Sequence, residues 1–264
     1  MNSIRQLRLQ AVSLTLTALV ALPSASVAQT PTSQRRMPVV VELFTSEGCS
    51  SCPPADALLA RLDREQPVST AEIIVLEEHV DYWEQDGWHD RFSSSQYTDR
   101  QNQYAPRLKF DSVYTPQMVV DGATQFVGNN GPRAYQAIVA AAQTPKITLS
   151  LSTPVLDGRH VGSSVSSPAS ASPLPKADLY AALVEPKATT EVLRGENGGH
   201  HLEHAGVVRS LQRIGKLQDL ASGAVKFNLT APAGVAPTNM RVVVFAQESG
   251  QGSIRGATIT TIKQ

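Results

Sequence analysis

The only two cysteines of the chain, Cys49 and Cys52, stand three positions apart at the junction between two contrasting segments. Residues 39–44, just before them, are mostly apolar and β-branched, which predicts a buried strand. Two prolines follow the pair directly and suit the first turn of a helix, where their missing N–H groups would have no partner anyway. Leucines then recur at helical spacing across residues 55–65. The pattern predicts a strand, a loop and a helix, with the cysteine pair where the helix begins.

The first 28 residues are predicted to be a secretory signal peptide and not part of the fold. Arg5 and Arg8 form a positive region, residues 11–22 are mainly apolar, and residues 26–28 read Ser-Val-Ala, a small-x-small cleavage site. The alternative is a retained membrane anchor, which is disfavoured because Pro23 and the small-x-small site are what a signal peptidase needs. We therefore expect a periplasmic or secreted protein without stable membrane insertion.

Export of the protein favours a redox role for the cysteine pair. In an oxidising compartment two such thiols are expected to form a disulfide at rest. A bridge over so short a loop removes little entropy from the unfolded chain, so it is a poor device for stability. One alternative is a static disulfide on an inert scaffold. Another is a zinc site, but zinc takes four ligands and the pair supplies two, so no metal is expected.

The rest of the first half reads as a sequence of strands and helices. Its order is β-α-β, a helical insertion, then β-β-α, and Asp121-Gly122 predicts a two-residue hairpin turn. The further elements expected are a strand at 73–76, helical structure at 91–108, strands at 117–120 and 124–127, and a helix at 131–142.

Past residue 145 the sequence changes to short alternating segments joined by Pro- and Ser-rich connections. This pattern predicts an antiparallel β-sandwich. We expect a signal peptide over 1–28, an α/β domain over 29–145 and an all-β, sandwich-like domain over 146–264. The strands expected in the last domain lie at 147–151, 178–184, 224–229, 241–246 and 254–262.

Composition excludes several classes of function. The 23 basic residues balance 23 acidic ones, so there is no basic surplus of the kind that nucleic acids or anionic membranes attract. The sequence has no glycine-rich phosphate loop and no Gly-x-Ser-x-Gly. We expect no nucleic-acid partner, no cofactor and no serine hydrolase chemistry.

A strand that leads into Cys-x-x-Cys at a helix start, with Thr115-Pro116 before a later hairpin, resembles the thioredoxin fold. Residues 42–56, 79–83 and 114–122, with 194–197 and 207–209 further on, resemble the secreted family known as domain of unknown function 1223. The resemblance covers nearly the whole mature chain. It implies an exported protein with an α/β thioredoxin-like domain that carries a helical insertion, and it implies no established reaction.

The resemblance also bears on two local features. In the thioredoxin superfamily the proline at the place of Pro116 is cis and packs against the disulfide, where it would pair with an extended substrate and block metal capture. The structural alternative is a proline at a strand entrance. One departure from the family pattern is Glu77-Glu78, which stands where apolar strand residues are expected and leaves the end of the second strand open.

In a redox centre Cys49 would be the attacking thiol and Cys52 the resolving one. A helix N-terminus stabilises a thiolate through its unpaired N–H groups and its dipole. Ser50 and Ser51 are expected to leave free N–H groups near the sulfur. Glu47 acts in the opposite sense, because a nearby carboxylate disfavours a second negative charge. The direction of the redox reaction therefore stays open.

Residues after the second strand are candidates for the rim of the site. The carboxyl ends of parallel strands face the ligand crevice in α/β sheets, so His79, Asp81 and Trp83 are expected near Cys49, together with Thr115. His79 or Asp81 would carry protons. The alternative is that Tyr82 and Trp83 cover the inserted helices, and Trp88 and His89 are interpreted as packing residues.

A histidine cluster, His200, His201 and His204, has a spacing that can bind metal. Gly198 and Gly199 favour a solvated loop instead. Glu196 and Asn197 are interpreted as loop anchors at the domain interface.

The function predicted from these features is an exported thiol-disulfide oxidoreductase. It would act on protein or peptide thiols through a mixed disulfide at Cys49, which Cys52 releases. A second hypothesis is a non-catalytic binding protein that uses the same scaffold. A third is copper or another soft metal held by the cysteines with a histidine.

Overall fold

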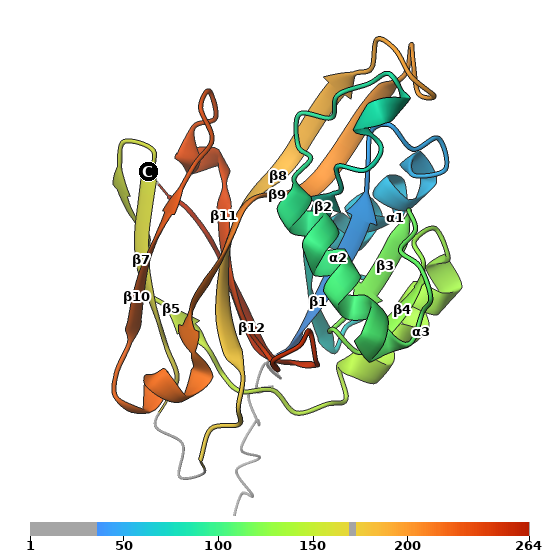
Figure 1. Ribbon diagram of the computed structural model, residues 1–264. Helices are drawn as coiled ribbons and strands as arrows, with labels where there is room; N and C mark the ends of the chain where they lie inside the picture. Colours follow the sequence, from blue (N-terminus) through green and yellow to red (C-terminus); the bar gives the residue numbers. More distant parts are fainter. Residues whose placement is uncertain (1–35, 169–172, 264) are drawn as a thin grey trace, which may run out of the picture. The chain divides into compact units, whose positions relative to one another are not determined.

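The computed structural model describes residues 36–168 and 173–263 of the chain, and the signal peptide predicted over 1–28 lies outside them. These described residues form a mixed α/β fold built on a large mixed sheet with few helices, which confirms the α/β class (Figure 1). None of their helices is long and apolar enough to cross a membrane.

The large sheet has eight strands in the order β12-β11-β8-β9-β2-β1-β3-β4 among the described residues (Figure 1). β1 and β2 are parallel, whereas β3 runs antiparallel to β1 and β4 antiparallel to β3. β8 is antiparallel to both β9 and β11. The bounds of the strands are β1 Met37–Thr45, β2 Ala71–His79, β3 Gln117–Val120, β4 Thr124–Val127, β8 Asp178–Glu191, β9 His201–Lys216, β11 Arg241–Gln247 and β12 Ile254–Thr261.

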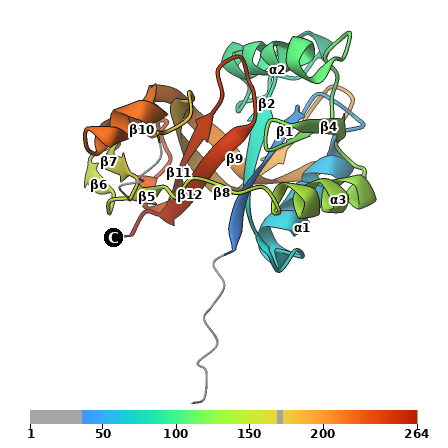
Figure 2. The ribbon, with the colours of Figure 1, turned by 90° about the horizontal axis from the view of Figure 1, so that it is seen from below.

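Helices cover both faces of the first half of this sheet. Figure 2 shows α1 (Pro53–Glu65) and α3 (Gly131–Ala141) on one side and α2 (Ser95–Leu108) on the other. Alternate residues of β1 therefore face different helices, and both sets are buried. Three 3-10 helices complete the described helical structure: Glu84–Asp86, Leu217–Ala221 and Pro237–Asn239.

The alternation along β1 also explains an acidic residue inside an apolar strand. Glu42 is fully buried on the α2 side, where its carboxylate accepts a hydrogen bond from Arg100 Nε at 2.6 Å and one from the Tyr104 hydroxyl at 2.5 Å. A buried charge is tolerated when it is paired and hydrogen-bonded. Glu42 thus fixes α2 to the sheet by a charged contact that the apolar pattern does not show.

A smaller sheet packs against the second half of the large one. Its order is β10-β7-β5, and β6 pairs with β7. Val161 and Val165 of β7 share an apolar core with Leu179 and Leu183 of β8. The bounds are β5 Ser150–Leu151, β6 Val155–Asp157, β7 His160–Ser166 and β10 Val225–Thr230.

The second half of the chain joins the first half through β9. β9 pairs in parallel with β2 at Glu77 and Val207, so the large sheet continues across the boundary predicted near residue 145. β9 was not predicted as a strand. Gly206 lies where β2 and β9 pair, which we call the seam of the sheet, and its φ is +74°. A β-carbon placed on it would stand 2.6 Å from Val75 Cγ2 and 2.9 Å from the Val75 carbonyl oxygen.

Two further local predictions differ from the structure. β2 extends through Glu77 and Glu78 to His79, because both carboxylates are buried against partners and do not end the strand. The hairpin turn between β3 and β4 has three residues, since Val120 pairs with Thr124.

We predict that Gly206→Ala destabilises the fold more than Gly199→Ala. Both glycines have a left-handed φ, but a β-carbon on Gly199 meets nothing within 4 Å, whereas one on Gly206 overlaps Val75. Both variants carry the backbone strain, and Gly206→Ala adds the clash, which we expect to cost about 1 to 3 kcal/mol more. Urea unfolding measures the difference. Equal destabilisation by the two substitutions contradicts the tight seam between β2 and β9.

Candidate redox-active site

Cys49 and Cys52 form a disulfide at the start of α1. Their α-carbons lie 5.4 Å apart, and Cys52 occupies the N-cap position of the helix. The Ala55 and Asp56 N–H groups donate to the Cys52 carbonyl oxygen, so the first turn of α1 fixes the second cysteine. Both cysteines are fully buried, while Ser50 and Ser51 between them are exposed.

A loop from the second half of the chain holds the cysteine segment from outside. The Asn197 side chain donates to the carbonyl oxygens of Glu47 at 2.9 Å and Cys49 at 3.0 Å. The Ser50 N–H donates to Glu196 Oε2 at 3.1 Å, so the prediction that this N–H is free is wrong. Hydrogen bonds from the side chain and the backbone of Ser50 hold the pKa of Glu196 below its usual value. Glu196 and Asn197 therefore anchor the loop between β8 and β9 on the cysteine segment.

Trp83, Thr115 and Pro116 lie around the same segment. The Thr115–Pro116 peptide is cis, and Pro116 is buried just before β3. A β-carbon placed on Gly128 would stand 3.0 Å from Pro116 Cβ and 3.1 Å from Ala55 Cβ, so Pro116 lies close to the first turn of α1. Trp83 Nε1 donates to Thr115 Oγ1 at 2.8 Å.

Trp83 also touches the residue before the first cysteine, because a β-carbon on Gly48 would stand 3.1 Å from Trp83 Cβ. The structure therefore brings Trp83 to the cysteine segment and Thr115 beside Trp83. It does not bring Asp81 there. The Asp81 carboxylate accepts a hydrogen bond from Thr98 Oγ1 at 2.6 Å, which ties it to α2.

His79 is not at a rim, because β2 continues through it and the side chain is fully buried. His79 Nδ1 lies 2.7 Å from Asp90 Oδ2. Trp88 Nε1 donates to Glu47 Oε2 at 2.7 Å, so Trp88 has a polar role besides packing. His89 is exposed and pairs with Glu84.

A cluster of buried polar side chains lies where β2, β9 and the cysteine segment meet. His204 Nδ1 lies 2.9 Å from Glu77 Oε1, and His79 Nε2 lies 3.7 Å from the same oxygen. Glu77 Oε2 accepts from the Ala205 N–H at 2.7 Å. The prediction of a solvated histidine loop is wrong for His204, which is buried in β9, while His200 and His201 are exposed.

The electrostatics of the cluster depend on burial and on these contacts. Burial alone lowers the pKa of His204, but the Glu77 carboxylate outweighs it and raises the pKa to about 9. For Glu77, burial acts upward, and the His204 contact reverses this and lowers the pKa to about 2. Glu77, His79 and His204 together form the group of described residues with the geometry to hold a metal ion.

Asp56 is a site residue that sequence reasoning missed. It is buried on the apolar side of α1, one turn after Cys52, and Oδ1 accepts from Thr45 Oγ1 at 2.7 Å. Burial, helped by the Glu77 charge, raises the pKa of Asp56 to about 7. The available signal was an acidic residue at helical spacing with Leu59 and other buried positions.

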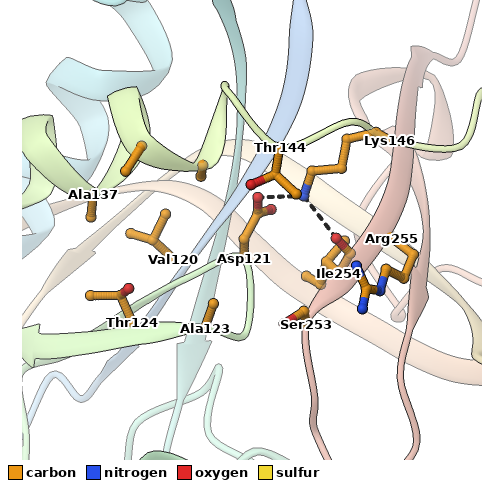
Figure 3. A pocket seen from close by; sticks show the side chains of 12 residues that line it. Val120, Asp121, Ala123, Thr124, Ala137, Thr144, Lys146, Ser253, Ile254 and Arg255 are labelled. Carbon is orange, nitrogen blue, oxygen red and sulfur yellow. Dashed lines mark hydrogen bonds and ion pairs between the residues drawn. The ribbon is translucent and has the colours of Figure 1, made fainter.

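A separate pocket of about 200 Å³ lies between the β3–β4 turn, α3 and the start of β12 (Figure 3). The buried Lys146 side chain donates to Asp121 and, at 2.7 Å, to the Ile254 carbonyl oxygen. Asp121 Oδ1 in turn accepts from the Val40 N–H. This pocket holds neither cysteine. Its ion pair fastens the chain that follows α3 to the β3–β4 turn, and the hydrogen bond to Ile254 fastens it to β12.

The chain is similar to one protein family and to several solved structures. The family model described as "Protein of unknown function (DUF1223)" matches residues 40–247. The crystal structure of protein AGR_C_4864 from Agrobacterium tumefaciens is 26% identical with a TM-score of 0.64, over 88% of this chain and 97% of that one. HBP35 of Porphyromonas gingivalis, 15% identical, has the same fold with a TM-score of 0.57 over 86% of this chain and 76% of that one. No curated protein matches the chain.

We predict that Asp56→Asn stabilises the protein at pH 8 and leaves stability unchanged near pH 4. The folded carboxyl has a pKa of about 7 against a usual 3.8, so the folded state binds more protons between these values and stability falls as pH rises through them. Removing the group abolishes this loss, which amounts to ~4 kcal/mol at most. Thermal unfolding in chelator-treated buffer measures it. The same effect of Asp56→Asn at pH 4 and pH 8 contradicts the raised pKa.

Proposed function

We propose, from the premise that the chain belongs to the DUF1223 family, that it is an exported thiol-disulfide oxidoreductase acting on protein or peptide thiols. The observation that carries the proposal is the Cys49–Cys52 disulfide at the N-terminus of α1. Its location in the periplasm or outside the cell follows from the signal peptide predicted over residues 1–28.

The arrangement of the first half supports a thioredoxin-like domain with α2 as its helical insertion. β1, α1 and β2 form a parallel unit, β3, β4 and α3 follow, and the four strands lie in the order β2-β1-β3-β4. The small sheet of the second half shares an apolar core with β8 and β11, which supports a sandwich-like arrangement of this part. β9 and the loop before it bring this part to the cysteines.

The chemistry needs no group beyond the two sulfurs and the substrate. A substrate thiolate attacks Cys49 Sγ, the Cys49–Cys52 bond breaks, and Cys52 leaves as a thiolate. A second substrate thiolate then attacks the substrate sulfur of the mixed disulfide and releases Cys49, so the substrate is oxidised and the pair is reduced. The reverse sequence reduces a substrate disulfide.

The helix supports the reduced state of this cycle. The N–H groups and dipole at the start of α1 stabilise a thiolate at the cysteine pair. Glu196 opposes that effect, because its carboxylate is hydrogen-bonded to the residue directly after Cys49. The balance between the dipole of α1 and the charge of the Glu196 carboxylate sets the reactivity of Cys49.

A second candidate function is a non-catalytic binding protein, and the burial of both cysteines favours it. In the oxidoreductase, a substrate reaches Cys49 after groups over the sulfur move. The loop at 194–199, exposed except for Asn197, is the segment we assign to this movement, because among the described residues its hydrogen bonds to the cysteine segment come from Glu196 and Asn197 alone.

We predict that Cys52→Ala accumulates a mixed disulfide on Cys49. Without the resolving thiol, Cys49 keeps the half of a peptide disulfide or of oxidised glutathione that it attacks. Mass spectrometry of the intact protein measures the adduct. Cys49→Ala is the matched control, because it also lacks the disulfide and retains one thiol, and it should stay unmodified.

The opposite result is informative because both variants lose the same bridge. If folded Cys52→Ala forms no adduct while the same protein in urea does, Cys49 is shielded and the pair is a static disulfide. The binding-protein function then stands.

We predict that Glu196→Gln, made in the Cys52→Ala background, lowers the pKa of the Cys49 thiol. The amide keeps an oxygen that accepts from the Ser50 N–H but removes a negative charge close to the sulfur. We expect a decrease of roughly half a unit to one unit. Ultraviolet absorbance of the thiolate against pH measures it, and Glu203→Gln, exposed on β9, is the control. An unchanged pKa shows that Glu196 does not act on Cys49.

A further inference from the structure

The buried cluster at the seam of the sheet contains residue types that bind metal ions. We propose that Glu77, His79 and His204 bind a divalent transition-metal ion, zinc being the ion of best fit. One potential ligand atom from each residue lies within 4.8 Å of the others, and all three side chains are buried. Two ligands at 2.0–2.1 Å from a tetrahedral ion stand about 3.3 Å apart. The separations of Glu77 Oε1 from His204 Nδ1 and His79 Nε2, 2.9 and 3.7 Å, bracket that value.

His79 is oriented as a metal ligand. Its Nδ1 faces Asp90 Oδ2 at 2.7 Å, and its Nε2 is buried without a hydrogen-bond partner. A histidine that donates one ring N–H to a carboxylate presents the lone pair of the other nitrogen, which is the usual arrangement behind metal-bound histidine. Asp90 is itself fixed, because it also accepts from the N–H groups of Glu47 and Phe92.

Glu47 does not belong to the ligand set, because it faces the other ring nitrogen of His204. Its Oε1 lies 3.5 Å from His204 Nε2, whereas Glu77 contacts Nδ1. Buried polar atoms in folded proteins nearly always have partners, and His79 Nε2 has none although it faces the Glu77 oxygen that His204 contacts. A cation between Glu77, His79 and His204 supplies that partner.

The charges and ligand types of the cluster select the ion. Glu47, Glu77 and Asp90 place three buried carboxyl groups around two imidazoles. This excess of acidic groups favours a bound cation. Two imidazole nitrogens disfavour calcium and magnesium, which prefer oxygen ligands, and the cluster contains no thiolate to select Cu(I).

The ion would act as a structural clamp. Glu77 and His79 belong to β2, and His204 belongs to β9. One ion therefore joins the two halves of the sheet at the place where they pair. His204 in turn contacts Glu47, two residues before Cys49. It forms no bond with the disulfide, so binding does not depend on the redox proposal.

The test uses the mature wild-type protein with its disulfide intact, freed of metal by unfolding with a chelator and refolding. Titration with Zn²⁺, followed by desalting and elemental analysis, should leave one ion per chain and raise the melting temperature. Co²⁺ should give the visible spectrum of nitrogen and oxygen ligands without a thiolate charge-transfer band.

Variants locate the ion. His204→Gln should lose it, while His201→Gln, exposed on the same strand, and the double variant Cys49→Ser/Cys52→Ser should retain it. If refolded wild type binds no zinc, or if the cysteine variant loses the ion, the proposal is wrong. The cluster is then a network of imidazolium–carboxylate pairs. Should His204→Gln fail to fold, the wild-type titration decides alone.

Discussion

The Glu77 carboxylate joins the two halves of the large sheet, because one oxygen accepts from the backbone of Ala205 and the other contacts His204. β2 and β9 pair at this place, beside Gly206, where a side chain would meet Val75. The charge is buried, so it is stable only with its partners in place, and loss of one partner leaves an uncompensated charge. The seam is therefore fixed by electrostatics as well as by strand pairing.

The pairing of β9 with β2 also brings residues of the second half to the cysteine segment. β8 and β9 extend beyond the small sheet to reach β2, and the loop between them carries Glu196 and Asn197 onto the cysteine segment. The first half supplies the disulfide, the helix start and Pro116. The second half supplies Glu196 and Asn197, which hold the cysteine segment by hydrogen bonds. Residues about 150 positions away in the sequence therefore hold the segment that carries Cys49.

The sequence predicted the elements whose pattern is local. The strand before Cys49, the helix after Cys52 and the hairpin after Pro116 each show their own periodicity or turn residues, and the anchoring by Glu196 and Asn197 was inferred. β9 was missed because its strand character depends on β8 and β2, whereas its own residues mix histidine, arginine and glycine. The burial of His79, His204 and Asp56 was missed for a related reason: the groups that pair with them belong to other elements, 11 positions away for His79 and Asp56 and 127 for His204.

The claim that the cysteine pair is a working redox centre depends on whether protein thiols can exchange with it. Equilibration of the purified protein with glutathione or dithiothreitol buffers, read by thiol alkylation, gives its reduction potential. The account predicts a two-electron transition between about −120 and −270 mV, the span of known thiol-disulfide oxidoreductases. A disulfide that stays oxidised below about −300 mV is of the structural kind and contradicts it.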